Sequence, residues 1–381
     1  MQLNTHRYRS ASGWAEPLAT ALDSAQSLVL VFGASEFASE QRPFDDLAAA
    51  FPDAVIAGCS TSGEISGAQV HDASISVAVA RFAHTRLKIA VTEVAGPADS
   101  GAAGERLATQ LCGDPDLCAV FVLSDGLCVN GTPLVAGLTR HLPPGVAITG
   151  GLAGDGSRFA STWVLARGVP RRHHVSAVGF YGRRLQVGMG CEGGWQDFGP
   201  ERRITRSEGN VLFELDGKPA LDLYKDYLGH LAQGLPGTAL LFPLSIRRPQ
   251  ATSAPVVRTI LGVDETQRSL TFAGDVPQGW VGRLMRTSND GLIGSAAVAV
   301  AQATHGLNAC GDALVVSVSC VGRRLVLGER TEEEIESIVA GLPQGAAHVG
   351  FYSYGEISPN SDGGASELHN QTMTVTVFSE T

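Results

Sequence analysis

Three apolar runs divide the chain into similar segments. The runs are LVLVFGAS at 28–35, AVFVLSDG at 119–126 and ALVVSVSC at 313–320. Each leads through a helix-like segment, which stops at a proline, into a second set of similar stretches: FPDAVIAGCSTSGEI at 51–65, LPPGVAITGGLAGDG at 142–156 and LPQGAAHVGFYSYGEI at 342–357. Short apolar runs between turn residues are typical of buried strands. The pattern predicts a unit of strand, helix, strand, Gly-acid turn and hairpin that occurs three times.

Further strand pairs follow the first two units. The segments ASISVAVARFAHTRLKIAVTEV and HVSAVGFYGRRLQVGMG each contain two apolar stretches around a turn with basic residues. The helix is clearest in the third unit, TEEEIESIVAGLP, where Thr331 is placed to cap the N-terminus and acidic residues fill the first turn. We therefore predict the α/β class, with mixed β-sheets packed with helices and internal strand-helix-strand-turn repeats.

The spacing of the units predicts two domains. The first two units lie close together in the chain, whereas the third follows an insert. The start of that insert contains a strand, a Gly-Lys-Pro turn at 217–219 and an amphipathic helix over 219–232. A chain of 381 residues also exceeds the usual domain size of about 100–200 residues. We expect an N-terminal domain over 1–200 and a C-terminal domain over 201–381.

Composition and charge exclude several functional classes. Hydrophobic residues make up 44% of the chain and charged residues 17%, as in a compact globular protein. The formal net charge of −10 disfavours nucleic acid as a partner. The N-terminus lacks the apolar region of a signal peptide, and the longest weakly polar run, 292–303, is too short for a membrane span. Seven cysteines without a C-x-x-C pair predict buried thiols, so we expect a cytoplasmic protein.

At these motifs the sequence resembles the FIST family of bacterial sensory proteins, which have an N-terminal and a C-terminal part. The N-terminal resemblance rests on VIAGCSTSGEI at 55–65 and GGLAGDG at 150–156. The C-terminal resemblance rests on a longer set of segments: PALDLYKDYLG at 219–229, RTILGVDE at 258–265, FAGDVPQG at 272–279, SCVGRRLVLGERTEEE at 319–334, GFYSYGEISP at 350–359 and LHNQTMTVTVF at 368–378. Together these segments cover nearly the whole chain.

The resemblance implies a sensor that binds a small ligand and regulates a signalling protein. It implies a histidine kinase or a cyclic-dinucleotide enzyme (a diguanylate cyclase or phosphodiesterase) as partner, and we expect a separate chain because the sequence shows no output domain. Stand-alone members include haem-binding proteins that sense nitric oxide. That subgroup implies haem b as the cofactor. A homodimer is an open alternative for the oligomeric state.

The turn GFYSYGEISP holds the strongest group of polar side chains. A glycine-flanked turn after a strand can project Tyr352, Tyr354 and Glu356 into a pocket while its backbone stays close to a ligand. Glu64 is the counterpart of Glu356 in the first unit. The alternative is that both acids only cap a turn.

A single histidine is the candidate metal ligand. On the predicted helix 219–232, the spacing of Leu223, Tyr227 and His230 places them on one face. A histidine on such a face can be the proximal ligand of haem iron, and the absence of C-x-x-C-H excludes covalent attachment. The alternative is an ordinary core or surface histidine. Tyr227 is included in the predicted cofactor site.

Arginines provide a candidate anion site. Arg247, Arg248 and Arg258 flank a proline-rich stretch that can close over a carboxylate or a haem propionate. The alternative is a solvated loop.

Asn370, just before the final strand, either orients a ligand or holds the backbone in place. We expect the ligand pocket in or beside the C-terminal half of the chain.

Motifs of common enzyme classes are missing from the sequence. It contains no G-x-S-x-G elbow, phosphate-binding loop or H-E-x-x-H pattern, so we expect no catalytic activity. Ser60 and Cys59 are the remaining candidate nucleophiles, but no base can be assigned to them. Three functions stay open: a haem-based gas sensor, a sensor of a small organic ligand such as an amino acid, and a hydrolase-like enzyme.

Overall fold

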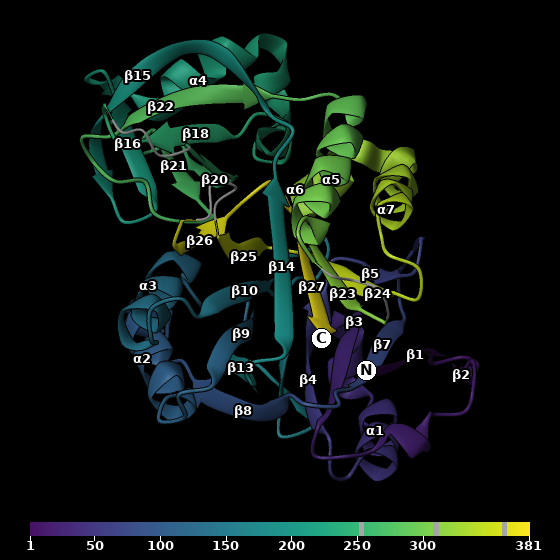
Figure 1. Cartoon of the computed structure of the whole chain (residues 1–381). Helices are drawn as coiled ribbons and strands as arrows, with labels where there is room; N and C mark the ends of the chain where they lie inside the picture. Colours follow the sequence, from purple (N-terminus) through teal and green to yellow (C-terminus); the bar gives the residue numbers. More distant parts are fainter. Residues whose placement is uncertain (251–254, 308–311, 360–363) are drawn as a thin grey trace.

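The computed structural model describes residues 1–250, 255–307, 312–359 and 364–381. Three similar units form a base, and a fourth part of the chain forms a lobe above it (Figure 1). We use "base" for residues 1–192 and 289–381 and "lobe" for residues 195–288. The lobe is inserted into the third unit.

The first unit contains one α-helix, of nine residues. Its elements are β1 (Gln2–Arg9), β2 (Gly13–Trp14), β3 (Ser27–Ala34), α1 (Arg42–Ala50), β4 (Val55–Thr61), β5 (Glu64–Ser66), β6 (Gln69–His71) and β7 (Ile75–Arg81). The second unit repeats this order with one more helix: β8 (Arg86–Glu93), α2 (Ser100–Leu111), β9 (Leu117–Ser124), α3 (Gly131–His141), β10 (Ala147–Leu152), β11 (Val164–Ala166), β12 (Val169–Arg171) and β13 (His174–Tyr181).

The third unit has the same order around the inserted lobe. Its elements are β14 (Leu185–Glu192), α5 (Asn289–Thr304), β23 (Leu314–Cys320), α6 (Val321–Leu327), α7 (Thr331–Ala340), β24 (Ala347–Ser353), β25 (Gly355–Pro359), β26 (Ser366–His369) and β27 (Met373–Glu380). The prediction of three strand-helix-strand-turn repeats is therefore confirmed.

Strand pairing follows the same rule in each unit. The two main strands are parallel, in the pairs β3/β4, β9/β10 and β23/β24, and the last strand runs antiparallel to the first. The short hairpin, however, pairs with a neighbouring unit: β11 with β4, β25 with β10, and β5 with β24. The units thus exchange hairpins in a closed cycle.

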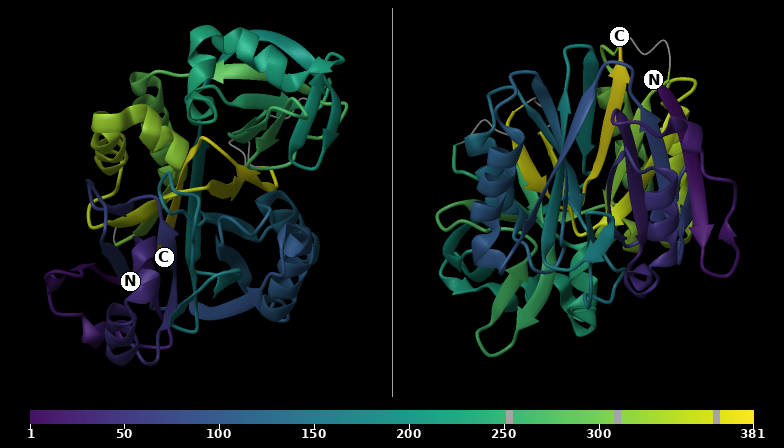
Figure 2. Two further views of the ribbon diagram at one scale, coloured as in Figure 1. Left: turned by 180° about the vertical axis from the view of Figure 1, so that it is seen from behind. Right: turned by 90° about the horizontal axis from the view of Figure 1, so that it is seen from below.

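The core lies where the three sheets meet. In β3, Leu28, Leu30 and Phe32 face a central cluster that also contains residues of β9 and β23, whereas Val29 and Val31 pack on the α1 side. Side chains alternate in this way because successive residues of a strand point to opposite faces. Phe32 stacks on Phe351 of the third unit at a centroid distance of 4.8 Å. Helices cover the outer faces, and both chain ends lie close together (Figure 2).

The lobe is mostly antiparallel sheet with one helix against it. Its elements are β15 (Gln196–Glu208), β16 (Val211–Leu215), β17 (Lys218–Pro219), α4 (Ala220–Leu228), the 3-10 segments η4 (Gly229–Gly234) and η5 (Gly237–Leu241), β18 (Leu244–Arg247), β19 (Val256–Arg258), β20 (Ile260–Asp264), β21 (Ser269–Phe272) and β22 (Val281–Arg286). The predicted helix 219–232 is wrong at its C-terminal end. Gly229 has φ +55°, a left-handed conformation that stops α4 at Leu228.

Candidate functional site

Two chain crossings join the lobe to the base. They lie side by side, because the hydroxyl of Thr287 donates a hydrogen bond to the carbonyl of Gly194 at 2.7 Å. A second contact lies at the start of α3, where the Asn130 side-chain amide donates to a carboxylate oxygen of Asp275 at 2.8 Å. A further contact lies at η5, where the Gln371 side-chain amide of the base donates to the carbonyl of Leu240 at 3.1 Å. The lobe therefore meets the base at the two crossings and at separate contact surfaces.

A pocket of about 480 Å³ opens at the contact surface beside α3. We call it the inter-lobe pocket. The lobe contributes Arg248, Arg258 and Trp280. The base contributes side chains of α3 and the segment from residue 365 to Leu368, which includes most of β26. The volume lies in the range of small-molecule sites, about 300–1,000 Å³.

Arg258 is the most unusual residue of the inter-lobe pocket. It is buried, and its guanidinium donates to backbone carbonyls of Asp275, Val257 and Leu368 at 3.1, 3.3 and 3.0 Å. In the described parts of the chain, no carboxylate oxygen lies within 4.0 Å of its nitrogens. The loss of hydration on burial lowers the pKa of Arg258 to about 10, against the opposite effect of Glu367 and Asp275. The arrangement leaves a buried positive charge without a salt-bridge partner among the described residues.

Other polar groups surround this charge. Arg248 lies over the ring of Trp280 at 5.6 Å, and Arg140 reaches the pocket from α3. The buried hydroxyl of Thr132 has no hydrogen-bond partner among the described residues. Arginines recognise carboxylates, whereas the nearby acids Asp275 and Glu367 can accept from an ammonium group. The pocket is thus suited to a small carboxylate, with or without an amino group.

The carboxylates of Glu356 and Glu64 accept hydrogen bonds within the fold and do not face a ligand pocket. The hydroxyl of Ser353 donates to one oxygen of Glu356 at 2.6 Å, and the backbone N–H and hydroxyl of Thr372 donate to the other. Glu64 receives the equivalent bonds from Thr61 and Ser74. Burial raises the pKa of both carboxyl groups to about 7, although these hydrogen bonds lower it. Neither acid lines the inter-lobe pocket, and both close equivalent turns.

The two tyrosines of the same turn differ in their surroundings. Tyr352 is fully buried and donates to the Glu334 carboxylate at 2.8 Å. Tyr354 donates to Asp155 and to the carbonyl of Gly156, and its ring stacks on Phe159. Tyr354 lines a second cavity, of about 200 Å³, between base and lobe. We call it the aromatic cavity.

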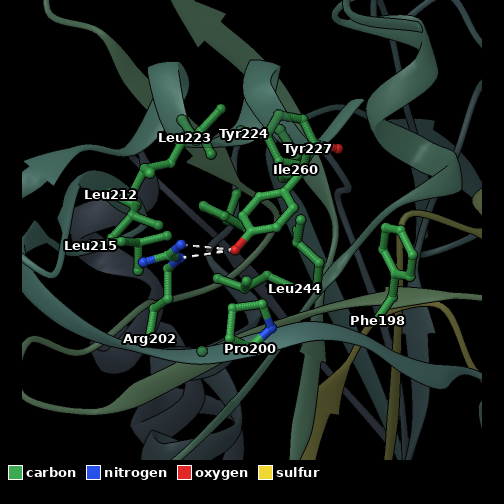
Figure 3. A pocket seen from close by; sticks show the side chains of 14 residues that line it. Phe198, Pro200, Arg202, Leu212, Leu215, Leu223, Tyr224, Tyr227, Leu244 and Ile260 are labelled. Carbon is green, nitrogen blue, oxygen red and sulfur yellow. Dashed lines mark hydrogen bonds between the residues drawn. The ribbon is translucent and has the colours of Figure 1, made fainter. Parts of the chain in front are cut away.

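Tyr227 and His230 do not share a site. The Tyr227 hydroxyl accepts from Arg202 at 2.9 and 3.1 Å beside an apolar cavity of about 20 Å³ inside the lobe (Figure 3). His230 lies beyond the end of α4, in η4, where it is exposed and does not line that cavity. A cavity this small holds about one water molecule, whereas a haem requires several hundred Å³. The apolar cavity beside Tyr227 is therefore too small for a haem, and His230 does not line it.

Two further residues that the sequence suggested, Arg247 and Asn370, do not line the inter-lobe pocket. Arg247 pairs with Glu201 at 2.6 Å outside the inter-lobe pocket, and the adjacent loop 251–254 lies outside the described residues. Asn370 is fully buried, and its side-chain atoms have no hydrogen-bond partner in the part of the chain that the structure describes.

The candidate nucleophiles are inaccessible. Ser60 and Cys59 are fully buried in β4, and the Ser60 hydroxyl accepts from the backbone N–H of Trp163 at 3.0 Å. Burial raises the pKa of the Cys59 thiol well above its usual range, which disfavours the reactive thiolate. The prediction of buried cysteines holds for Cys59, Cys191 and Cys320, but three others are half-buried and Cys310 lies outside the described residues.

The family of the protein follows from its sequence matches. The FIST N domain matches residues 27–218, and the FIST C domain matches residues 220–359. The chain belongs to the FIST family, whose domains are sensory, ligand-binding signalling modules. The position of a domain boundary near residue 200 stays a prediction. Among the described residues, no helix is long and apolar enough to cross a membrane.

Solved structures with a related arrangement are distant. A chorismatase has 10% sequence identity and a TM-score of 0.38, covering 99% of this chain and 97% of that chain. A cyanuric acid hydrolase has 12% identity and a TM-score of 0.25, covering 78% and 69%. The cyanuric acid hydrolase from A. caulinodans has 13% identity and a TM-score of 0.19, covering 78% and 99%. No curated protein matches the sequence.

Sequence reasoning found only part of this candidate site. It selected Arg248 and Arg258 but missed Thr132, Asp275 and Trp280. The apolar and polar pattern of α3 predicts a helix, and nothing in it indicates that the lobe packs against its N-terminus.

Proposed function

We propose that this protein is a sensor whose effector is a small organic carboxylate, such as an amino acid, bound in the inter-lobe pocket. The observation that carries the proposal is Arg258, a buried cation that lines the pocket and has no counter-ion in the described residues. A ligand carboxylate would supply the missing charge. We further propose that the protein acts by binding and is not an enzyme.

Ligand binding can be converted to a signal through the lobe. The ligand would contact Arg258 and Trp280 of the lobe and α3 of the base at once. A ligand shifts a conformational equilibrium when it binds one arrangement more tightly than another. A lobe attached by two adjacent crossings is a suitable moving part, since hinge motion needs only a few residues to change. We propose a separate histidine kinase or cyclic-dinucleotide enzyme as the receiver.

Titration calorimetry with L-amino acids and three- to six-carbon carboxylates tests this function, with the corresponding amides as control ligands. Arg248→Gln should weaken binding by about tenfold or more, because a charge-assisted hydrogen bond contributes about 1.5–3 kcal/mol. Arg247→Gln is the matched control and should bind as the wild type does, since Arg247 pairs with Glu201 outside the pocket. If no carboxylate binds the folded wild type, the proposal is wrong.

Haem b held through His230, with nitric oxide as the effector, is the second candidate. It rests on the family resemblance alone, since His230 is exposed and lines neither the inter-lobe pocket nor the apolar cavity beside Tyr227. An absorption spectrum of protein produced with ample haem tests it directly. A Soret band that is lost in His230→Ala would favour haem over the carboxylate, whereas a colourless wild-type protein would contradict it.

A further inference from the structure

We propose that the aromatic cavity is a second ligand site, which binds a neutral planar aromatic molecule. The cavity is separate from the inter-lobe pocket, although both lie between lobe and base. The hydrogen bond from Asn130 to Asp275 connects the walls of the two: Asn130 lines the aromatic cavity and Asp275 the inter-lobe pocket.

Phe159 provides a ring face for such a ligand. Its side chain is 40% exposed, and its ring stacks on Tyr354 at 4.7 Å with an interplanar angle of 12°. The residue has φ +50°, which is unfavourable for a bulky side chain. Asp155 holds this conformation by accepting the backbone N–H groups of residues 159, 160 and 161 at 2.8–2.9 Å. The fold thus fixes an aromatic ring at the cavity instead of burying it.

The walls of the cavity favour an uncharged ring. Leu127 of the base and Leu261 of the lobe line it, and each is more exposed than usual for a leucine, at 38% and 43%. Of the described residues that line the cavity, none has a charged side chain. A volume of about 200 Å³ excludes a peptide or a helix and leaves a molecule of one or two rings.

Asn210 provides a polar side chain at the wall of the cavity. The Asn210 side-chain amide donates to the carbonyl of Phe272 at 2.7 Å, and its oxygen has no hydrogen-bond partner in the described parts of the chain. Asn130 differs, because its side-chain oxygen already accepts from Thr132 and its amide donates to Asp275. The structure therefore provides a stacking face and one acceptor, which suits a planar ring that carries an N–H or O–H group.

Indole is the appropriate probe, with benzofuran as its matched control ligand. Indole is neutral and planar and has one N–H donor, whereas benzofuran has an oxygen in that position. Titration followed by saturation-transfer NMR should show saturable binding of indole and weaker binding of benzofuran. Equal binding of the two would rule out Asn210 as the acceptor.

Two variants test the position of the probe. Phe159→Leu should weaken indole binding by about fivefold, since an aromatic pair contributes about 0.5–1.5 kcal/mol beyond its buried area. Leu261→Trp should abolish it by filling the cavity from the lobe side. Leu325→Trp is the control, because Leu325 is equally exposed, at 46%, but does not line this cavity. The proposal fails if the wild type does not bind indole or if Leu261→Trp binds it as tightly as the wild type.

Discussion

Glu356 and Glu64 should make the stability of the protein fall as the pH rises above 4.5. Burial raises the pKa of each carboxyl from an ordinary 4.5 to about 7 in the folded state. The folded protein therefore binds more protons than the unfolded chain between these values, and its unfolding free energy decreases as the pH increases through this window. The difference corresponds to about 3 kcal/mol for each glutamate. The contribution is complete below pH 4.5 and is lost above pH 7.

Glu356→Gln isolates one of these two groups. Glutamine is neutral at every pH and keeps an acceptor for Thr372, while the Ser353 hydroxyl can rotate to accept from the new amide. Between pH 4.5 and pH 8, the wild type should lose about 3 kcal/mol of unfolding free energy relative to the variant. Urea unfolding followed by circular dichroism at a series of pH values measures this difference.

Glu332→Gln is the matched control for the loss of a carboxylate. Glu332 is exposed on α7, so this variant should follow the pH dependence of the wild type. Glu64→Gln should reproduce the effect of Glu356→Gln, because its carboxyl receives equivalent hydrogen bonds. A constant difference between the wild type and Glu356→Gln from pH 4.5 to pH 8 would refute the reasoning.

Further substitutions test the packing of the third unit by urea unfolding. Arg323→Met should destabilise the protein by about 3–5 kcal/mol, because it leaves Glu334 buried without the ion pair that now joins them at 2.7 Å. Arg330→Met, which breaks two partly exposed pairs with Asp290 and Glu333, should cost less, about 1 kcal/mol. Gly190→Ala should cost at least about 2 kcal/mol, since the added Cβ would lie 1.9 Å from the carbonyl oxygen of Ala299. Gly294→Ala, in open space on α5, should instead stabilise the helix by about 0.8–1 kcal/mol, and a loss of stability there would contradict the described packing.

The sequence is informative where structure is local. The apolar runs and the Gly-acid turns predict all three units, because period and turn chemistry are encoded within a few residues. The hairpin exchange could not be predicted in this way. Nothing in the sequence of β5, which has only three residues, identifies β24 as its partner, since this pairing depends on tertiary packing.

The candidate site, too, is only partly predictable from the sequence. The sequence predicts Arg258 as a site residue together with Arg247 and Arg248, but its burial against backbone carbonyls, without a salt bridge among the described residues, is a property of the folded chain. The predicted helix 219–232 runs past Gly229, although glycine commonly ends a helix at that position. A shorter helix would have removed His230 from the face of Tyr227.

The hairpin cycle affects the order in which the protein can be completed on the ribosome. The strand β5 ends at Ser66, but its partner β24 begins only at Ala347. At about 5–20 residues per second, the hairpin emerges tens of seconds before that partner is made. Its open edge must be kept from pairing with other nascent chains for that time, and the closing of the cycle is necessarily among the last events of synthesis.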